Sequence, residues 1–253
     1  MDRHSALGRA LMPSLTMLFA VLLSCGCAAL NRKGVAVQIL CGENLLTNGS
    51  FENGTFVGGP RDPAIMELGD KSTAVNGWVV SFSTGPRPHR HLSWVRNGNH
   101  LGLPASDSTH FLFWNTTRVN DDSVYPSIDQ TIPLPIGHFL LSFDVGQHPP
   151  SQNSKVVHII AGIDNYCENA GGYGESRGFS AIVGGPDWQH QALEFTTARL
   201  EGAEETTPCF LRVGFIAEAG PIFTVPPPES EQYVSLDNVS LRRFGLGSCV
   251  AER

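Results

Sequence analysis

The sequence predicts an all-β protein, an antiparallel β-sandwich of the jelly-roll type, on three observations. Apolar residues recur with a period of two in several segments. The 27 glycines and 17 prolines are spread along the 253 residues. Helical periodicity over long stretches is absent. Many short strands separated by turns, with no helices between them, indicate an antiparallel sandwich.

The expected strands differ in how their apolar residues are spaced. Segments 139–145, 193–196 and 211–217 alternate apolar and polar residues, as strands with one buried face do. Segment 156–163 is almost continuously apolar, which predicts a central strand covered on both faces. The polar or Pro-rich stretches 58–75 and 218–231 are expected to be surface loops.

The last expected strand, near the C-terminus, changes phase in the middle. Val234 and Leu236 share one parity. Val239 and Leu241 share the other. Because side chains alternate with a period of two, both pairs are buried only if one residue is inserted between them. We therefore predict a β-bulge starting at Asp237.

The N-terminus has the pattern of an export signal over residues 1–30. Arg3 and Arg9 precede a nine-residue apolar run at 15–23, and small residues follow. A membrane-spanning helix needs roughly 20 apolar residues, so cleavage by signal peptidase is favoured over anchoring, and no transmembrane segment is expected afterwards. Residues 31–43 are expected to be a linker, and 44–253 a single domain.

Two modes of processing remain open. Cys27-Ala28-Ala29 suits an ordinary signal peptidase, which would release a secreted, extracellular or cell-wall protein. Leu22-Leu23-Ser24-Cys25 is similar to a bacterial lipobox, which would leave a surface lipoprotein anchored through Cys25.

The charge balance limits the classes of partner. The chain has 17 basic and 24 acidic residues, and without Asp2, Arg3 and Arg9 these become 15 and 23. A net charge near −8 argues against nucleic acid, which requires a basic surface. It argues equally against electrostatic docking on anionic lipid.

Four cysteines follow the signal segment, and an even number in an exported chain predicts disulfides. We expect the pairs Cys41–Cys249, at the two ends of the domain, and Cys167–Cys209. Free buried thiols are the alternative. The sequence also contains four Asn-x-Ser/Thr sequons, which matter where the host glycosylates and makes the chain a glycoprotein. They begin at Asn48, Asn53, Asn115 and Asn238.

Seven short motifs, taken in order, carry a resemblance to a known family. They are NLLTNGSFE (44–52), GWVV (77–80), WVRNG (94–98), PASDSTHFL (104–112), IDQTI (128–132), GHFLLSFD (137–144) and LDNVSL (236–241). The set resembles the galactose-binding-like jelly-roll domains known as the domain of unknown function 642 family, which includes plant cell-wall proteins and exported bacterial proteins. The plant members have two such domains in tandem, whereas this chain has room for one.

The resemblance implies a carbohydrate-binding or cell-wall-associated module without established catalytic activity. Related jelly rolls often hold a structural calcium ion, Ca²⁺, near the start and end of the domain. The matching positions here are Glu52 and Asp237. Loop carbonyl groups could supply the further oxygen ligands that calcium needs. Alternatively, both carboxylates only accept hydrogen bonds from backbone groups and hold the terminal strands together.

A sugar site needs flat aromatic faces beside a few polar groups. Trp94 and Trp114 stand among polar residues, so we expect a ligand surface formed by these two with Arg96 and Asn115. Burial in the core is the alternative for each tryptophan, and it is the expectation for Trp78.

The sequence offers little support for catalysis or a transition-metal site. His89-Arg90-His91 could place two imidazoles on one strand face, but the prolines at 86 and 88 favour a loop. A G-x-S-x-G nucleophile elbow is absent. We therefore expect a non-catalytic extracellular module whose partner is a polysaccharide or glycan of the cell wall or extracellular matrix. A small exported carbohydrate-active enzyme and a structural surface protein without a small ligand are the alternatives.

Overall fold

The computed structural model describes residues 38–82, 91–115, 126–147, 157–168, 173–183, 187–219 and 233–246. The chain divides into two compact units. The larger unit is Leu40–Phe244. The smaller one combines Met1–Ile39 with Gly245–Arg253, of which only residues 38–39 and 245–246 are described.

The described residues form strands joined by turns and loops, without a helix. The strands are β1 (Gln38–Cys41), β2 (Ile65–Leu68), β3 (Val79–Phe82), β4 (His91–Arg96), β5 (His110–Asn115), β6 (Pro126–Pro133), β7 (Gly137–Gln147), β8 (Val157–Cys167), β9 (Tyr173–Val183), β10 (Gln189–Thr197), β11 (Cys209–Ala219) and β12 (Tyr233–Leu246).

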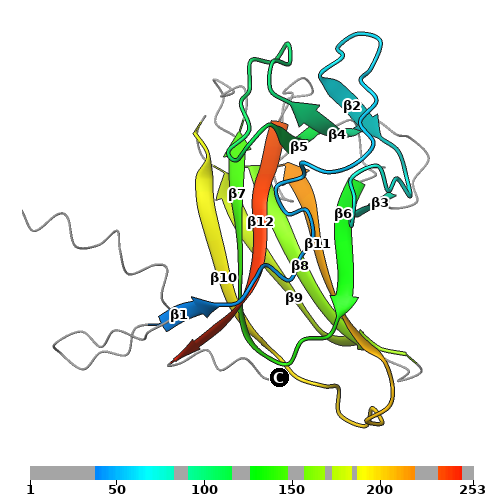
Figure 1. Ribbon diagram of the computed structural model, residues 1–253, viewed down its shortest axis with the longest axis vertical. Coiled ribbons are helices and arrows are strands. Elements are labelled where there is room, and N and C mark those ends of the chain that lie inside the picture. Colours follow the sequence, from blue (N-terminus) through cyan, green and yellow to red (C-terminus); the bar gives the residue numbers. More distant parts are fainter. Residues whose placement is uncertain are drawn as a thin grey trace, which may run out of the picture. The chain divides into compact units, whose positions relative to one another are not determined.

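The strands make two antiparallel sheets (Figure 1). The seven-stranded sheet has the order β10-β7-β12-β5-β4-β2, with β1 also belonging to it. The five-stranded sheet has the order β3-β6-β11-β8-β9. The eight strands β5 to β12 are divided as β5-β12-β7-β10 and β6-β11-β8-β9, which is the strand order of a jelly roll. The predicted fold class is therefore confirmed.

The core lies between the inner faces of the two sheets. The alternating residues predicted to be buried are buried on β7 and β11, at 1% exposure or less. Trp78 is also in the core, as predicted, at 1% exposure. The largest buried side chains are Trp78, Trp94, Trp114, Phe51, Phe111, Phe139, Phe143 and Phe215. Burial of such side chains contributes about 1.5–3 kcal/mol each.

The β-bulge predicted near the C-terminus is present in β12. Asp237 pairs with Asp144 and Ser240 with Ser142, so two residues of β12 oppose one residue of β7. Asn238, in the bulge, has φ of +50°, a left-handed conformation that asparagine tolerates better than most residues. The bulge restores the phase, and residues on both sides of it are buried.

Two predictions about the strands are wrong. The stretch 58–75 is not all loop, because it contains β2, which pairs with β4. Of the stretch 156–163, residues Val157–Ile163 belong to β8, which lies between β11 and β9 as an interior strand but is not covered on both faces. Ile159, Ala161 and Ile163 are buried, whereas the outward Ile160 is only half-buried. The continuous apolar run therefore reflects an apolar outer surface rather than a second buried face.

Cys167 and Cys209 form the predicted disulfide. They are partners in the register of β8 and β11. Cys249 lies outside the described residues, as do the signal segment and the possible lipobox, so the pair Cys41–Cys249 stays a prediction. In the part of the chain that is described, no helix has the length and apolar character needed to cross a membrane.

Candidate functional site

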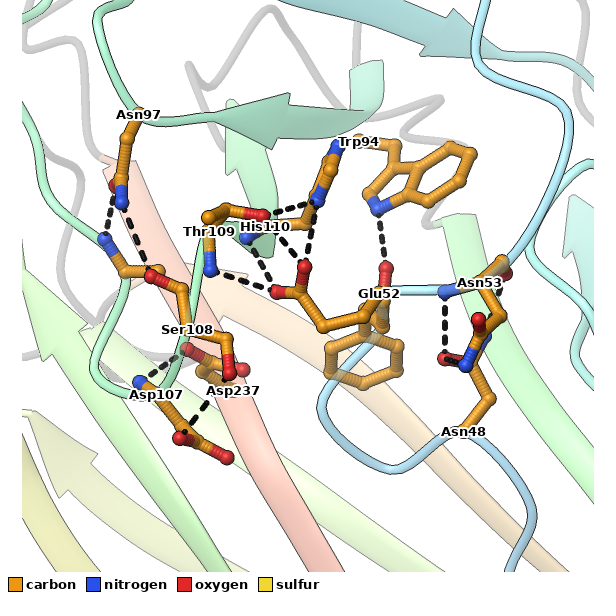
Figure 2. A network of polar contacts seen from close by, with 12 residues as sticks. Asn48, Glu52, Asn53, Trp94, Asn97, Asp107, Ser108, Thr109, His110 and Asp237 are labelled. Carbon is orange, nitrogen blue, oxygen red and sulfur yellow. Dashed lines mark hydrogen bonds and ion pairs between the residues drawn. The ribbon is translucent and has the colours of Figure 1, made fainter.

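The two tryptophans expected at a ligand surface are in the core instead. Trp94 and Trp114 are each 1% exposed. The indole nitrogen of Trp94 donates to the Phe51 carbonyl oxygen at 2.9 Å (Figure 2), and that of Trp114 donates to the Pro126 carbonyl oxygen at 2.8 Å. The prediction of a ligand surface around them is therefore wrong. Each indole N–H donates to a backbone oxygen, so burial of the side chain leaves no unsatisfied donor.

The other two residues of that predicted patch remain at the surface. Arg96 is exposed, and its guanidinium donates to the Pro63 carbonyl oxygen at 3.0 Å and lies 4.9 Å from the centre of the Phe56 ring. Asn115 is half-buried and lines a cleft between β2, β4 and β5. The structure thus separates these two residues from the tryptophans with which they were grouped.

Glu52 holds one end of the loop that precedes β5 (Figure 2). Its carboxylate accepts the backbone N–H groups of Thr109 at 2.8 Å and His110 at 2.6 Å. It also contacts the Thr109 hydroxyl at 2.5 Å and the His110 Nδ1 at 3.0 Å. Burial alone would raise the pKa of Glu52, but the hydrogen bonds from Thr109 and His110 outweigh it and lower that pKa.

Asp237 holds the other end of the same loop. Its Oδ2 accepts the backbone N–H groups of Ser106 at 2.8 Å and Asp107 at 2.9 Å, and its Oδ1 accepts that of Asn238 at 2.7 Å. The side chain is completely buried. Burial raises the pKa of Asp237 to about 7 in spite of these donors.

The calcium ion that the resemblance implies at Glu52 and Asp237 stays a prediction. The oxygens of both carboxylates point at N–H and O–H donors, and a cation would have to displace them. Among the described residues, no group of three or more His, Cys, Asp or Glu side chains could hold a metal ion. Of the suggested imidazole pair, His91 is 3.8 Å from Glu67, while His89 lies outside the described residues.

A surface that the sequence did not indicate lies on the outer face of the five-stranded sheet. Gly178 on β9, Gly162 on β8 and Gly214 on β11 are partners in register, so three glycines form a row across three neighbouring strands. The row continues to Asp129 on β6 and Val79 on β3. We call the three-glycine row the glycine furrow.

The fold itself gives no reason for two of these glycines. None of the three has a positive φ. A Cβ atom at Gly162 would meet only the Gly214 carbonyl oxygen, at 3.9 Å, and one at Gly178 only a methyl group of Ile160, at 3.8 Å. Glycine inside a strand costs about 0.5–1 kcal/mol relative to alanine, and it often marks a place where a ligand approaches the backbone.

Different side chains flank the furrow on its two sides. On one side Ile160 and Ile216 are partners across β8 and β11 and are half-buried. On the other side Asp164 and Arg212 are partners, and the Arg212 Nε donates to the Asp164 Oδ2 at 3.0 Å. The furrow therefore has one apolar wall and one charged wall.

An aromatic pair and a carboxylate complete this face. Beyond the charged wall, the rings of Tyr166 and Phe210 lie 5.5 Å apart at an interplanar angle of 30°. At the end of the furrow, burial raises the pKa of the Asp129 carboxyl. The Arg212 charge opposes that shift and the Asp164 charge adds to it.

Comparison with known proteins assigns the chain to no family. No protein-family model matches it, and no curated protein sequence does. Similar solved structures include a family 16 carbohydrate-binding module, at 15% identity over 78% of this chain and 99% of that chain, with a TM-score of 0.43. The xylan-binding domain CBM22-1 of Paenibacillus barcinonensis Xyn10C is 13% identical over 81% and 96%, with a TM-score of 0.37.

Enzymes are among the similar structures as well. The enzymatically active domain of bacteriophage CBA120 tailspike protein 4 is 16% identical over 78% of this chain, with a TM-score of 0.45. This chain covers only 21% of that protein. The Stig cyclase Fisc from Fischerella sp. TAU is 13% identical over 85% of this chain and all of that one, with a TM-score of 0.46. Similarity this distant does not transfer function.

Proposed function

We propose that this protein is a non-catalytic module that binds an extended carbohydrate chain along the glycine furrow. The observation that carries the proposal is the row of Gly178, Gly162 and Gly214 across three strands. Two of these glycines are required neither by backbone conformation nor by lack of space. Neighbouring strands are about 4.8 Å apart, so the three glycines span roughly 10 Å, enough for about two sugar rings.

The walls of the furrow have the two chemistries that a sugar ring presents. A sugar has apolar C–H faces and a rim of hydroxyl groups that both donate and accept. Ile160 and Ile216 match the apolar faces, and the carboxylate and guanidinium of Asp164 and Arg212 match the hydroxyls. A polysaccharide or glycan of a cell wall or matrix is the partner that this arrangement favours.

The test is to fill the furrow without harming the fold. Gly162→Val and Gly178→Val add branched side chains on a strand at positions where the Cβ makes only ordinary van der Waals contacts, and where valine is favoured over glycine. We expect weaker retardation by soluble polysaccharides in affinity electrophoresis, with at least about tenfold loss of affinity, and an unchanged or higher melting temperature.

Gly69→Val is the matched control, because Gly69 faces open space and directly follows β2 in the seven-stranded sheet, whereas the furrow glycines lie on β8, β9 and β11. It should leave polysaccharide binding unchanged. Retained binding in both furrow variants would refute the proposal. So would a failure of the wild-type protein to bind any member of a broad glycan array.

One observation favours a second candidate function, a carbohydrate-active enzyme on the same face. Asp129 and Asp164 both border the furrow, and burial gives Asp129 a raised pKa, as in the general acid of a glycosidase. The test is release of reducing ends from labelled polysaccharides. Release that is lost in both Asp129→Asn and Asp164→Asn would establish catalysis, whereas binding without release supports the module.

We also propose that the chain is exported, either secreted or held at the surface through Cys25. The disulfide between Cys167 and Cys209 supports this, because disulfides persist mainly in oxidising compartments. Mass spectrometry of the mature N-terminus distinguishes a chain that starts near residue 30 from one that starts at a lipidated Cys25. An intact Met1 would contradict both.

A further inference from the structure

A cleft of about 830 Å³ opens on the outer face of the seven-stranded sheet. Strands β2, β4 and β5 and the segments at residues 57–62 and 100–101 line it. Its volume falls within the range of about 300–1,000 Å³ that is typical of sites for small ligands. It belongs to a different sheet from the glycine furrow.

The floor of the cleft is apolar and firmly supported. Ile65 on β2 and Phe113 on β5 project from the outer face of the sheet into the lining. Phe113 also belongs to a second small core with Val95, Leu103 and Phe111. Because these packed side chains lie beside Phe113 on the same face of the sheet, the floor keeps its shape without a ligand.

The Asp62 carboxylate connects two segments that line the cleft. Its Oδ1 accepts the backbone N–H of Ala64 at 2.7 Å. Its Oδ2 accepts the backbone N–H of His100 at 2.8 Å and contacts the His100 Nδ1 at 2.5 Å. One buried carboxylate thus ties the segment before β2 to the turn after β4, so the cleft is formed in advance, and little conformational entropy is lost on binding.

The polar rim is rich in hydrogen-bond acceptors. A neutral His100 that donates its Nδ1–H to Asp62 presents Nε2 as an acceptor. His91 adds a second imidazole to the rim, and its Nδ1 lies 3.8 Å from the Glu67 carboxylate, beyond hydrogen-bond distance. The half-buried Asn115 adds an amide. The charged residues of the lining include both signs, with Arg61 beside the carboxylates, so neither charge is selected.

We propose that this cleft is a second binding site, which takes one or two neutral, hydroxyl-rich rings, that is, a monosaccharide or disaccharide. The apolar floor suits the C–H face of such a ring, and the acceptors on the rim suit its hydroxyl donors. The proposal shares its ligand class with the proposed function but not its residues. The cleft is a pocket for the end or branch of a glycan, whereas the furrow holds the interior of a chain.

The test is a titration of the full-length protein, followed by amide NMR, with cellobiose, lactose and N-acetylglucosamine as separate probes. At least one probe should shift the amide signals of Ser93, His100 and Asn115 in a saturable way. Val57→Trp fills the rim, because Val57 is 65% exposed and lines the cleft. It should weaken binding at least about tenfold. His91→Ala should weaken it by a smaller factor, because only one polar group of the rim is lost.

Ile136→Trp is the matched control, since it adds the same indole at an exposed position outside the cleft lining. It should bind as the wild type does. The proposal is overturned if none of the three probes shifts these signals at tens of millimolar, or if Val57→Trp binds like the control. Gly162→Val separates the two sites: it should weaken polysaccharide binding at least about tenfold and leave the cleft shifts intact. Cleft shifts in a wild type that binds no polysaccharide would refute the proposed function alone.

Discussion

At the scale of single residues, two carboxylates from the ends of the domain hold one loop. Glu52 precedes β2, and Asp237 is in β12, yet they accept backbone N–H groups from the same segment, 106–110 (Figure 2). A carboxylate with several N–H donors stabilises a loop without needing a metal ion. The identity of these residues therefore has a structural explanation in hydrogen bonding.

The buried Asp237 should make stability depend on pH in a definite direction. Its pKa is raised to about 7 in the folded protein, so between about pH 4 and 7 the native state binds more protons than the unfolded state. The contribution of Asp237 to the free energy of unfolding is thus greatest at low pH and falls as pH rises to about 7. The slope is at most about 1.4 kcal/mol per pH unit.

The measurement is denaturant unfolding of the wild type and Asp237→Asn at several pH values. At pH 5 the Asp237 carboxyl is protonated, and its hydroxyl oxygen can still accept a hydrogen bond where asparagine has an NH₂ group, so the variant should lose about 1–3 kcal/mol. The difference should shrink as pH rises to 7, because only the wild type carries the titrating group. The control compares the wild type with Asp144→Asn, because the Ser106 hydroxyl lies within hydrogen-bond distance of both the Asp144 and the Asp237 carboxylates. A difference that grows with pH would contradict the assignment.

The same contacts disfavour calcium at this place. Since N–H donors use the oxygens of Glu52 and Asp237, added Ca²⁺ should not raise the melting temperature, and EGTA should not lower it. Scanning calorimetry at millimolar Ca²⁺ checks this. A calcium-dependent rise in melting temperature that occurs in the wild type but not in Glu52→Gln would show that the ion displaces these donors. Glu52 would then be a calcium ligand, as the resemblance implies.

At the scale of elements, the sequence predicts the buried faces of strands well, but it does not predict which residues form the exposed sites. Alternation predicts the buried faces of β7 and β11, and the phase change after Leu236 predicts the bulge, because both depend on neighbours along one strand. The glycine furrow depends on the alignment of three strands, which single-strand periodicity does not give. The sequence does not place Trp94 and Trp114 correctly, because the carbonyl oxygens that accept their N–H groups belong to other segments, at Phe51 and Pro126.

The disulfide between β8 and β11 gives a prediction at this scale. Cys167 and Cys209 are 42 residues apart, and the crosslink limits the freedom of that segment in the unfolded chain. Replacing both by serine should lower the free energy of unfolding by about 2–4 kcal/mol. Urea unfolding measures the change, and wild type kept in reductant should match the variant. Equal free energies of unfolding for the wild type and the double serine variant, both without reductant, would show that the disulfide contributes nothing.

At the scale of the whole domain, the two proposed sites face different ways. The furrow is on the outer face of the five-stranded sheet and the cleft on that of the seven-stranded sheet. Because the inner faces of a sandwich pack against each other, its outer faces point in opposite directions. One glycan chain of ordinary stiffness would not reach both sites, so each site is free to engage a separate chain.

A single molecule that engages two chains should crosslink a soluble polysaccharide. Mixing the wild type with a polysaccharide that it binds should raise the light scattering of the solution, because a protein molecule that holds two chains links them into larger particles. Gly162→Val and Val57→Trp should each abolish the rise, since a chain held at one site alone is not bridged. Ile136→Trp should keep it, and excess of a disaccharide that binds the cleft should reverse it. Scattering that persists in Val57→Trp would mean that the furrow alone, through self-association of the protein, links the chains.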